Sequence, residues 1–204
     1  MKHWFFGMLL VCFLMGTAGP NAESTEVGQS SPDFILTDTN GKSHSLSGSK
    51  GKFVVLEWVN YDCPFIKKHY GSGNMQNLQK AYREKGVVWF SINSSAPGKQ
   101  GHFSDEEVNK RMGEKGAAPT AYLQDPDGVV GKLYGARSTP HMFVINPNGI
   151  LIYQGALDSI ASTDPADIPK AKNFVAAALD EAMSGKPVSE SQTQSYGCSV
   201  KYAI

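Results

Sequence analysis

Cys63 is the residue of this sequence best placed to do chemistry, because it stands between a strand signal and a helix signal. The nearly continuous apolar run 53–60 precedes it, and Pro64 follows it directly. Proline suits the first position of a helix, where its missing N–H is not needed. A cysteine at the helix N-cap faces free N–H groups and the positive end of the helix dipole, and Lys67 and Lys68 add positive charge. We therefore predict that Cys63 is a redox nucleophile rather than an inert core cysteine.

A second cysteine, Cys12, falls inside a predicted signal peptide at residues 1–22. The segment has a short positive start, an apolar run at 4–15 and small residues that suit cleavage after Ala18 or Ala22. The apolar run is too short to span a membrane comfortably. We therefore expect cleavage rather than a retained anchor, a periplasmic or secreted protein, and no stable membrane span after removal of the signal.

Cleavage leaves two cysteines, Cys63 and Cys198, in an oxidising compartment. Cys198 lies beyond the last predicted helix, in a C-terminal tail at 188–204. Cys63 has no second cysteine within one helical turn, so we predict that Cys198 resolves a mixed disulfide or a sulfenic acid formed there. Gly197 and the polar residues before it predict a mobile tail. A permanent structural disulfide and an unpaired Cys198 are the alternatives.

Three further side chains could take part in chemistry near Cys63. Glu57 is an acid inside an apolar strand, where burial would raise its pKa and suit it to shuttle a proton. His69 and His141 could join Cys63 in a site for a soft metal ion. The simpler interpretations are an acid at a sheet edge and histidines that are only neighbours of the thiol, and our prediction includes no metal and no other cofactor.

The elements that must position these residues alternate along the chain. Apolar runs and alternating patterns predict strands at 31–38, 53–60, 87–93, 120–124, 142–146 and 151–154. Helical spacing predicts helices at 64–85 with a break at 71–73, from 104 onward, at 129–134 and at 169–183. This order predicts an α/β domain at 23–187, with a central mixed sheet flanked by helices and an extra N-terminal strand or hairpin.

Composition narrows the class of partner. The chain has 204 residues, 41% of them hydrophobic, with 19 basic and 19 acidic residues. It can bury an ordinary core, and its zero net charge argues against nucleic acid as the main partner. No internal run of about 20 apolar residues exists, which excludes a polytopic membrane protein.

These segments together resemble the thioredoxin-like superfamily, and in particular its redoxin or peroxiredoxin-like branch of the AhpC/TSA type, over residues 29–186. The resemblance rests on the segments 31–34, 41–42, 51–56, 63–64, 134–135 and 139–140. It implies a thioredoxin-like fold with a redox cysteine at a helix start. It also implies a cis Pro140 facing Cys63, with His141 close by. We expect Pro140 to be catalytic together with Cys63, Cys198 and Glu57.

The expected substrate contacts on this resemblance are Trp58, Pro64, Thr139 and His141. The sequence departs from the dithiol pattern of thioredoxins, because Ile66 stands where their second cysteine would be. It also has Leu56 and Asn60 where peroxiredoxins have a proline and a hydroxyl residue.

The predicted function is therefore an exported thiol-disulfide oxidoreductase or antioxidant redoxin. It would act on protein or small-molecule thiols and disulfides, or on peroxides, and use an unidentified reductant. Because of the departures at 56 and 60 we favour disulfide exchange as the main activity. The alternative is a copper-binding or non-catalytic module in which Cys63 and Cys198 form a structural disulfide.

Overall fold

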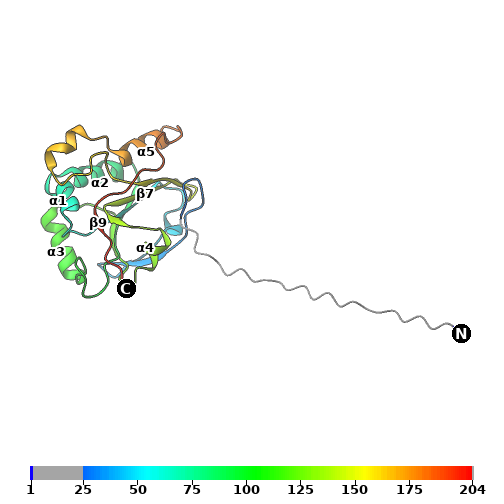
Figure 1. The fold of residues 1–204 in the computed structure, drawn as a ribbon, viewed down its shortest axis with the longest axis horizontal. Coiled ribbons are helices and arrows are strands. Elements are labelled where there is room, and N and C mark those ends of the chain that lie inside the picture. Colours follow the sequence, from blue (N-terminus) through cyan, green and yellow to red (C-terminus); the bar gives the residue numbers. More distant parts are fainter. Residues whose placement is uncertain (2–24, 204) are drawn as a thin grey trace.

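The computed structural model describes residue 1 and residues 25–203, so the predicted signal peptide at 1–22 lies almost wholly outside the described residues. The central sheet has seven strands in the order β2-β1-β5-β4-β3-β7-β8. Helices pack around this sheet (Figure 1). The strands are β1 Ile35–Asp38, β2 Ser43–Ser45, β3 Val54–Trp58, β4 Val88–Asn93, β5 Ala121–Gln124, β6 Ser138–Thr139, β7 His141–Ile145, β8 Leu151–Gly155 and β9 Cys198–Ser199. The helices are α1 Pro64–Gly71, α2 Asn74–Glu84, α3 Asp105–Lys115, α4 Val129–Leu133 and α5 Phe174–Met183, with short 3-10 helices at Ser47–Ser49 and Pro165–Lys170.

The sheet is mixed, as the sequence predicts. β3 pairs in parallel with β4, and β4 in parallel with β5, whereas β7 runs antiparallel to β3 and β8 antiparallel to β7. The N-terminal hairpin of β1 and β2 extends the sheet through an antiparallel pairing of β1 with β5. The predicted α/β fold with an additional N-terminal hairpin is confirmed.

β3 is buried on both faces, because helices cover one side of the sheet and α4 with the N-terminal segments covers the other. Val55 and Val59 pack with side chains of α1, α2 and α5. Val54, Leu56 and Trp58 pack on the opposite side with side chains from α4 and the N-terminal hairpin. The alternation of side chains along a strand therefore assigns each apolar residue of 54–59 to one of two apolar cores.

The break between α1 and α2 falls at the predicted glycines. Gly73 adopts a φ of 79° at the N-cap of α2, a backbone conformation that glycine tolerates well. Asn74 could have capped this helix, but no side-chain cap bond forms. Its amide Nδ2 lies 2.9 Å from Nδ1 of His69 instead. The glycine conformation thus sets the helix start, and Asn74 bonds back to α1.

The last helix begins later than the predicted residue 169. Asn173 is its N-cap, and the Asn173 side chain accepts a hydrogen bond from the Ala176 amide at 2.8 Å. Pro169 lies inside the preceding 3-10 helix, and Ala171 after it is extended. The apolar spacing continues through this segment, but the proline and the asparagine cap set the helix boundary.

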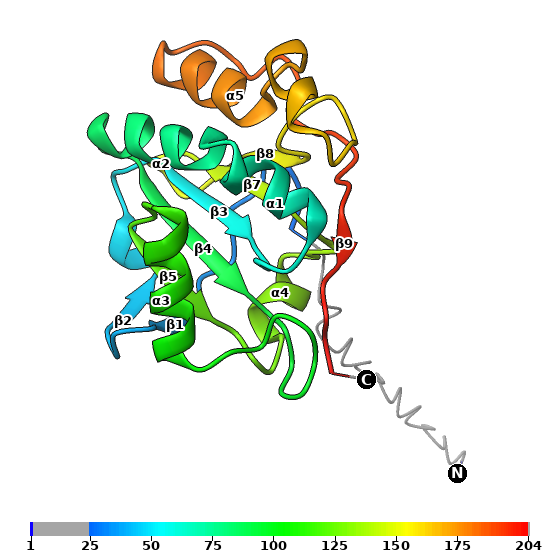
Figure 2. The ribbon, with the colours of Figure 1, turned by 90° about the vertical axis from the view of Figure 1, so that its left-hand side faces the viewer.

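The C-terminal tail lies along the domain rather than apart from it (Figure 2). The Thr193 amide donates to the carbonyl of Gln154, and the Ala96 amide donates to the carbonyl of Lys201. Between these points β9 pairs with β6. In this arrangement the tail is bonded to the domain along its length. Over the part of the chain that the structure describes, no helix is long and apolar enough to cross a membrane.

Candidate functional site

Cys63 is the N-cap of α1, as predicted, with φ −68° and ψ 127° and with Pro64 at the first helical position. Its amide donates to the carbonyl of Asn60, and its carbonyl accepts from the Lys67 amide, both at 2.9 Å. These bonds fix the thiol at the carboxyl end of β3. The Cys63 side chain has no exposed surface, whereas Pro64 beside it is exposed.

The predicted cis peptide is present between Thr139 and Pro140. The Cys63 Sγ donates to the Thr139 carbonyl oxygen at 3.1 Å, which places this peptide directly against the thiol. Residues that are 76 positions apart in sequence are thus brought together. The structure joins Cys63, Thr139 and Pro140 into one site.

Cys198 joins the same site through a two-residue ladder. β9 runs antiparallel to β6, and Cys198 is the register partner of Thr139. The Thr139 hydroxyl also lies 3.5 Å from the Cys198 carbonyl oxygen. Gly197 is required at its position, because its φ is +133° and an added Cβ would collide with the Thr139 carbonyl. Both cysteines carry free thiols.

The two thiols have opposite electrostatic environments. Burial raises the pKa of the Cys63 thiol, but hydrogen bonds from the side chains of Cys198 and Thr139 and from the Ile66 amide outweigh burial and bring that pKa below the ordinary value. Burial and the neighbouring Cys63 raise the pKa of Cys198 to about 11. Because the thiolate is the nucleophile, this difference favours Cys63 as the attacking sulfur near neutral pH.

Lys68 does not direct its positive charge to the Cys63 thiol, contrary to the sequence prediction. Its ammonium group is turned to the Asp158 carboxylate at 3.3 Å and to the Ile160 carbonyl at 3.0 Å. The Lys68 side chain is fully buried in that arrangement. Local hydrogen-bond donors, and not this lysine, therefore favour the Cys63 thiolate.

Glu57 lies in the interior, not at a sheet edge. Burial raises the pKa of its carboxyl group, and hydrogen bonds oppose that rise. The donors are Trp89 Nε1 at 2.8 Å, Tyr70 OH at 2.8 Å, Ser91 Oγ at 3.0 Å and Gln79 Nε2 at 3.0 Å. All four belong to α1, α2 and β4, so the carboxylate is enclosed by regular elements and its hydrogen bonds serve the core. Among the described residues it makes no hydrogen bond to Cys63.

Trp58 and His141 lie on the other side of the sheet from Cys63. The Trp58 indole packs at 5.2 Å from the Phe143 ring, and its Nε1 donates to Ser94 Oγ at 3.0 Å. The His141 ring also packs on Phe143, at 4.5 Å, and its Nδ1 accepts from the Arg137 amide. Both side chains are buried, so of the expected substrate contacts only Pro64 is exposed and only Thr139 contacts the thiol.

His69 and His141 are not assembled with Cys63 into a metal site. Burial lowers the pKa of each imidazole to about 4. The Nδ1 of His69 faces Asn74, and its Nε2 lies 3.7 Å from Asp158 without a hydrogen bond. Within residues 25–203 no group of three or more His, Cys, Asp or Glu side chains is placed to hold a metal ion.

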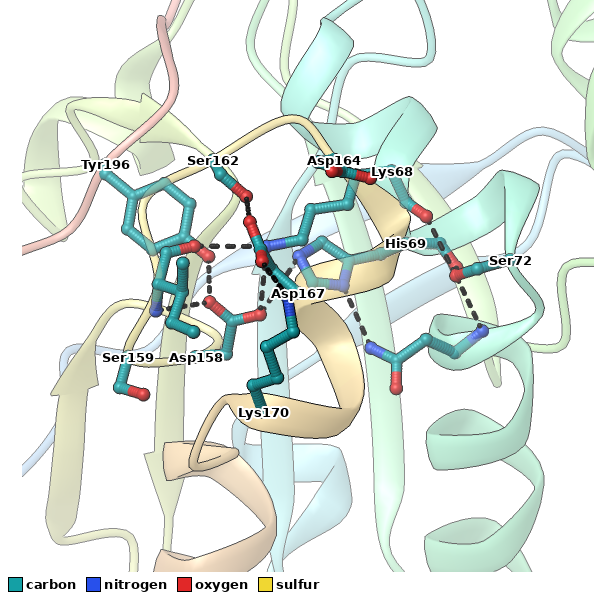
Figure 3. A network of polar contacts seen from close by, with 12 residues as sticks. Lys68, His69, Ser72, Asp158, Ser159, Ser162, Asp164, Asp167, Lys170 and Tyr196 are labelled. Carbon is teal, nitrogen blue, oxygen red and sulfur yellow. Dashed lines mark hydrogen bonds and ion pairs between the residues drawn. The ribbon is translucent and has the colours of Figure 1, made fainter.

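Three residues that sequence reasoning did not group together meet beside the site (Figure 3). Lys68 of α1 and Asp158 after β8, both buried, and the half-buried Tyr196 of the tail form one polar network. Of the three, only Lys68 could have been singled out from the sequence, because it is a charged residue on the buried face of a predicted helix. The other two became recognisable only when the fold brought 68, 158 and 196 together.

Comparison with known proteins supports the redox interpretation of this site. The model of the AhpC/TSA family matches residues 27–154. The thiol-disulfide oxidoreductase ResA of Bacillus subtilis is 32% identical over 130 residues, which cover 64% of this chain and 67% of ResA. The thioredoxin-like protein YneN of the same organism is 27% identical over 159 residues, covering 74% of this chain and 88% of YneN.

A crystal structure of an uncharacterized conserved protein from Geobacillus kaustophilus superimposes with a TM-score of 0.77 at 30% identity. The superposition covers 89% of this chain and 94% of that one. The shared architecture thus extends over nearly the whole described chain. The mixed sheet, the cysteine at a helix start and the cis proline facing it make this a thioredoxin-like fold.

Proposed function

Since this chain belongs to the AhpC/TSA family, we propose that it is a thiol-disulfide oxidoreductase in which Cys63 attacks and Cys198 resolves. The observation that carries the proposal is the register of β9 on β6, which sets Cys198 opposite Thr139 while Thr139 contacts the Cys63 thiol. The relatives named thiol-disulfide oxidoreductase support the same class of reaction.

The reaction proceeds in two exchanges. The Cys63 thiolate attacks one sulfur of a substrate disulfide, the substrate S–S bond breaks, and one substrate thiolate leaves while a mixed disulfide forms at Cys63. The Cys198 sulfur then attacks the Cys63 sulfur, its proton passes to the departing substrate thiolate, and a Cys63–Cys198 disulfide forms. Two electrons have moved from the protein to the substrate. A dithiol reductant restores both thiols by the reverse exchange.

The difference in pKa between the two thiols supports this order of the two steps. Cys63 ionises more readily because neighbouring donors stabilise its thiolate. Cys198 keeps its proton, because burial and the adjacent Cys63 raise the pKa of Cys198 to about 11. Cys198 gains nucleophilicity once Cys63 is bonded to substrate and no longer carries a negative charge, since Cys63 is one cause of the raised pKa.

Access to Cys63 requires movement of the tail. The thiol has no exposed surface while β9 is in place. β9 is held to β6 by only two register pairs, so it can detach at a lower cost than a strand of the central sheet. The exposed Pro64 then lies at the entrance for a substrate.

Disulfides fit this site better than peroxides. Asn60 stands where the family places a hydroxyl residue, and both ends of its amide are used, since Oδ1 accepts from the Asp62 amide and Nδ2 donates to the Gln100 carbonyl. Leu56 lies in the core on the opposite side of the sheet. Asn60 therefore lacks the hydroxyl group of the peroxiredoxin pattern, and the Leu56 side chain has no hydrogen-bond donor.

The test follows two exchanges in one reaction. A symmetrical aromatic disulfide that releases a coloured thiolate is mixed with the reduced protein, in a Cys12→Ser background that leaves Cys63 and Cys198 as the thiols. Two successive releases are expected, the first from attack and the second from resolution. Peptide mapping should then find a Cys63–Cys198 bond that a dithiol reductant opens. A single release, or a bond between these cysteines that resists the reductant and blocks exchange, would contradict the proposal.

Export of the protein is the second part of the proposal. It is supported by the sequence of residues 1–22, with its positive start, apolar run and small residues. A periplasmic or secreted location would also supply the oxidising environment in which disulfide exchange occurs. Intact mass of the protein purified from an exporting host should place the first residue near 19 or 23. Retention of Met1 in that material would overturn the export proposal.

A further inference from the structure

A buried ion pair lies where α1 meets the C-terminal tail (Figure 3). The Lys68 ammonium lies 3.3 Å from Asp158 Oδ2, and both side chains are almost completely buried. Ile160 fixes each partner, since its carbonyl accepts from Lys68 at 3.0 Å and its amide donates to Asp158 Oδ1 at 3.1 Å. The Asp158 carboxylate is therefore held rigidly. Its partner Lys68 lies five residues after Cys63 in the sequence.

Tyr196 of the tail binds to this fixed carboxylate. Its hydroxyl donates a hydrogen bond to Asp158 Oδ1. Its ring packs on Phe65 of α1, with 5.7 Å between the ring centroids. Tyr196 is two residues before Cys198, and Phe65 is two residues after Cys63. One side chain thus links the helix that carries the nucleophile to the strand that carries the second thiol.

Two other tail residues make hydrogen bonds to the domain but not to α1. The Thr193 hydroxyl contacts Tyr153 OH at 2.6 Å and the Ala156 amide at 2.9 Å, both beside β8. Tyr202 OH donates to the Ala136 carbonyl at 2.8 Å, after α4. These contacts hold the two ends of the tail, whereas Tyr196 binds the domain next to Cys198.

We propose that Tyr196 is a positioning residue for the resolving step, holding Cys198 at Cys63 through the Asp158 carboxylate. The inference rests on the proposed function, because it concerns the second exchange. The rate of that exchange depends on the effective concentration of the Cys198 sulfur at Cys63, and this concentration is set by the fraction of molecules whose tail is docked. A hydrogen bond to a carboxylate is stronger than one between neutral groups, so its loss lowers that fraction.

The experiment compares Tyr196→Phe with Tyr82→Phe, each in the Cys12→Ser background. Tyr196→Phe keeps the ring on Phe65 and removes only the hydroxyl. Tyr82→Phe is the matched control, since it removes a tyrosine hydroxyl that bonds to the Ala176 carbonyl at 3.1 Å, away from the tail. The aromatic disulfide is added in excess, and the two releases of coloured thiolate are timed separately. The temperature midpoint of unfolding is measured on each variant.

For Tyr196→Phe we expect the second release to slow about tenfold, the factor that corresponds to about 1.4 kcal/mol. The first release should become faster, because a less firmly docked tail uncovers Cys63 more often. A general loss of stability would not move the two releases in opposite directions. Tyr82→Phe should leave both releases unchanged.

Phe65→Leu provides a second variant, since it weakens the ring contact and leaves the hydroxyl bond in place. It should also slow the second release, by a smaller factor. The inference is overturned if Tyr196→Phe leaves the second release at the parental rate, or if both releases slow together as the unfolding midpoint falls. If the parent protein itself gives no second release, the proposed function has failed, and the inference fails with it.

Discussion

Glu57 and Cys63 are two buried reactive groups six positions apart in the sequence, and the elements that enclose them differ. The Glu57 carboxylate accepts hydrogen bonds from four side chains of α1, α2 and β4, all of them parts of the central framework. The Cys63 thiol lies at the carboxyl end of β3 and contacts the Thr139 carbonyl. Thr139 in β6 pairs with Cys198 in the short strand β9.

The difference shows that burial alone does not identify a reactive group. Releasing Glu57 would break the packing of helices against the sheet, so its polar bonds stabilise the fold. Uncovering Cys63 requires that a peripheral segment, the two-residue strand β9 with its neighbouring tail contacts, leave the domain, while the central sheet stays intact. A thiol covered by a peripheral segment can be inert at one moment and accessible at the next, which is what a two-step exchange needs. The expected effects of substitution at the two places should differ accordingly.

The largest effect is expected from Cys63→Ser. This change removes the nucleophile, so neither release of coloured thiolate should occur, while the circular dichroism spectrum and the unfolding midpoint stay close to those of the parent. The measurement is the absorbance of the released thiolate after addition of the aromatic disulfide. Persistent release through Cys198 in this variant would reverse the assigned roles of the two cysteines.

Cys198→Ser should remove the second release and preserve the first. With no resolving sulfur, the mixed disulfide at Cys63 should persist and be visible as added mass on the intact protein. Added dithiol should free it. Normal turnover of this variant in the absence of added thiol would show that another group performs the resolving step.

Glu57→Gln should destabilise the protein without altering the exchange. An amide cannot accept all four hydrogen bonds, so buried donors lose their partner and the free energy of unfolding should fall by about 3 kcal/mol. The matched control is Asp180→Asn, an acid-to-amide change at an exposed ion pair with Lys85, where the expected loss is within about 0.5 kcal/mol. Urea unfolding measures both. If Glu57→Gln instead slows the first release without loss of stability, the carboxyl group acts as a proton shuttle for Cys63.

Gly197→Ala should disturb the tail without touching either cysteine. An alanine Cβ there would collide with the Thr139 carbonyl, so the β6–β9 pairing should weaken. We expect a first release about tenfold faster and a second release about tenfold slower, each corresponding to about 1.4 kcal/mol.

Gly185→Ala is the control for this strain, because Gly185 also has a positive φ, 74°, and has open space where the Cβ would be. It should affect stability alone. Equal effects of the two alanines on the exchange would show that backbone strain, and not the lost contact with Thr139, is responsible.

The smallest expected effect is a difference between the two thiols in the pH dependence of their alkylation rates. Alkylation requires the thiolate, so the alkylation rate of each cysteine rises with pH up to its own pKa and then levels off. For Cys63 this rise should end below the pKa of an ordinary cysteine, because hydrogen-bond donors outweigh the effect of burial. For Cys198 the rise should continue to about pH 11. Peptide mapping of the alkylated protein in the Cys12→Ser background, which keeps both thiols, separates the two curves, and overlapping curves would contradict the assigned order of attack.

The sequence alone determined the parts of the site that depend on neighbouring residues. An apolar run, a cysteine and a proline in succession were enough to predict a strand, an N-cap and a helix start, since each of these is set within a few residues. The alternation of strands and helices predicted the mixed α/β sheet for the same reason. The cis peptide before Pro140 and the pairing of Cys63 with this peptide followed from the resemblance to a known family, and both are confirmed.

Only the tertiary structure decided what surrounds the two reactive groups. The donors to Glu57 come from α1, α2 and β4, and the partner of Lys68 is 90 residues away in sequence. Cys198 pairs with Thr139, 59 residues away in sequence, and the buried carboxylate of Asp158 accepts a hydrogen bond from Tyr196. Such contacts leave no local pattern, because any polar residue in the sequence could be exposed or buried until the chain closes around it. Short segments of the sequence determine local secondary structure, whereas the tertiary fold alone determines which distant groups are buried together.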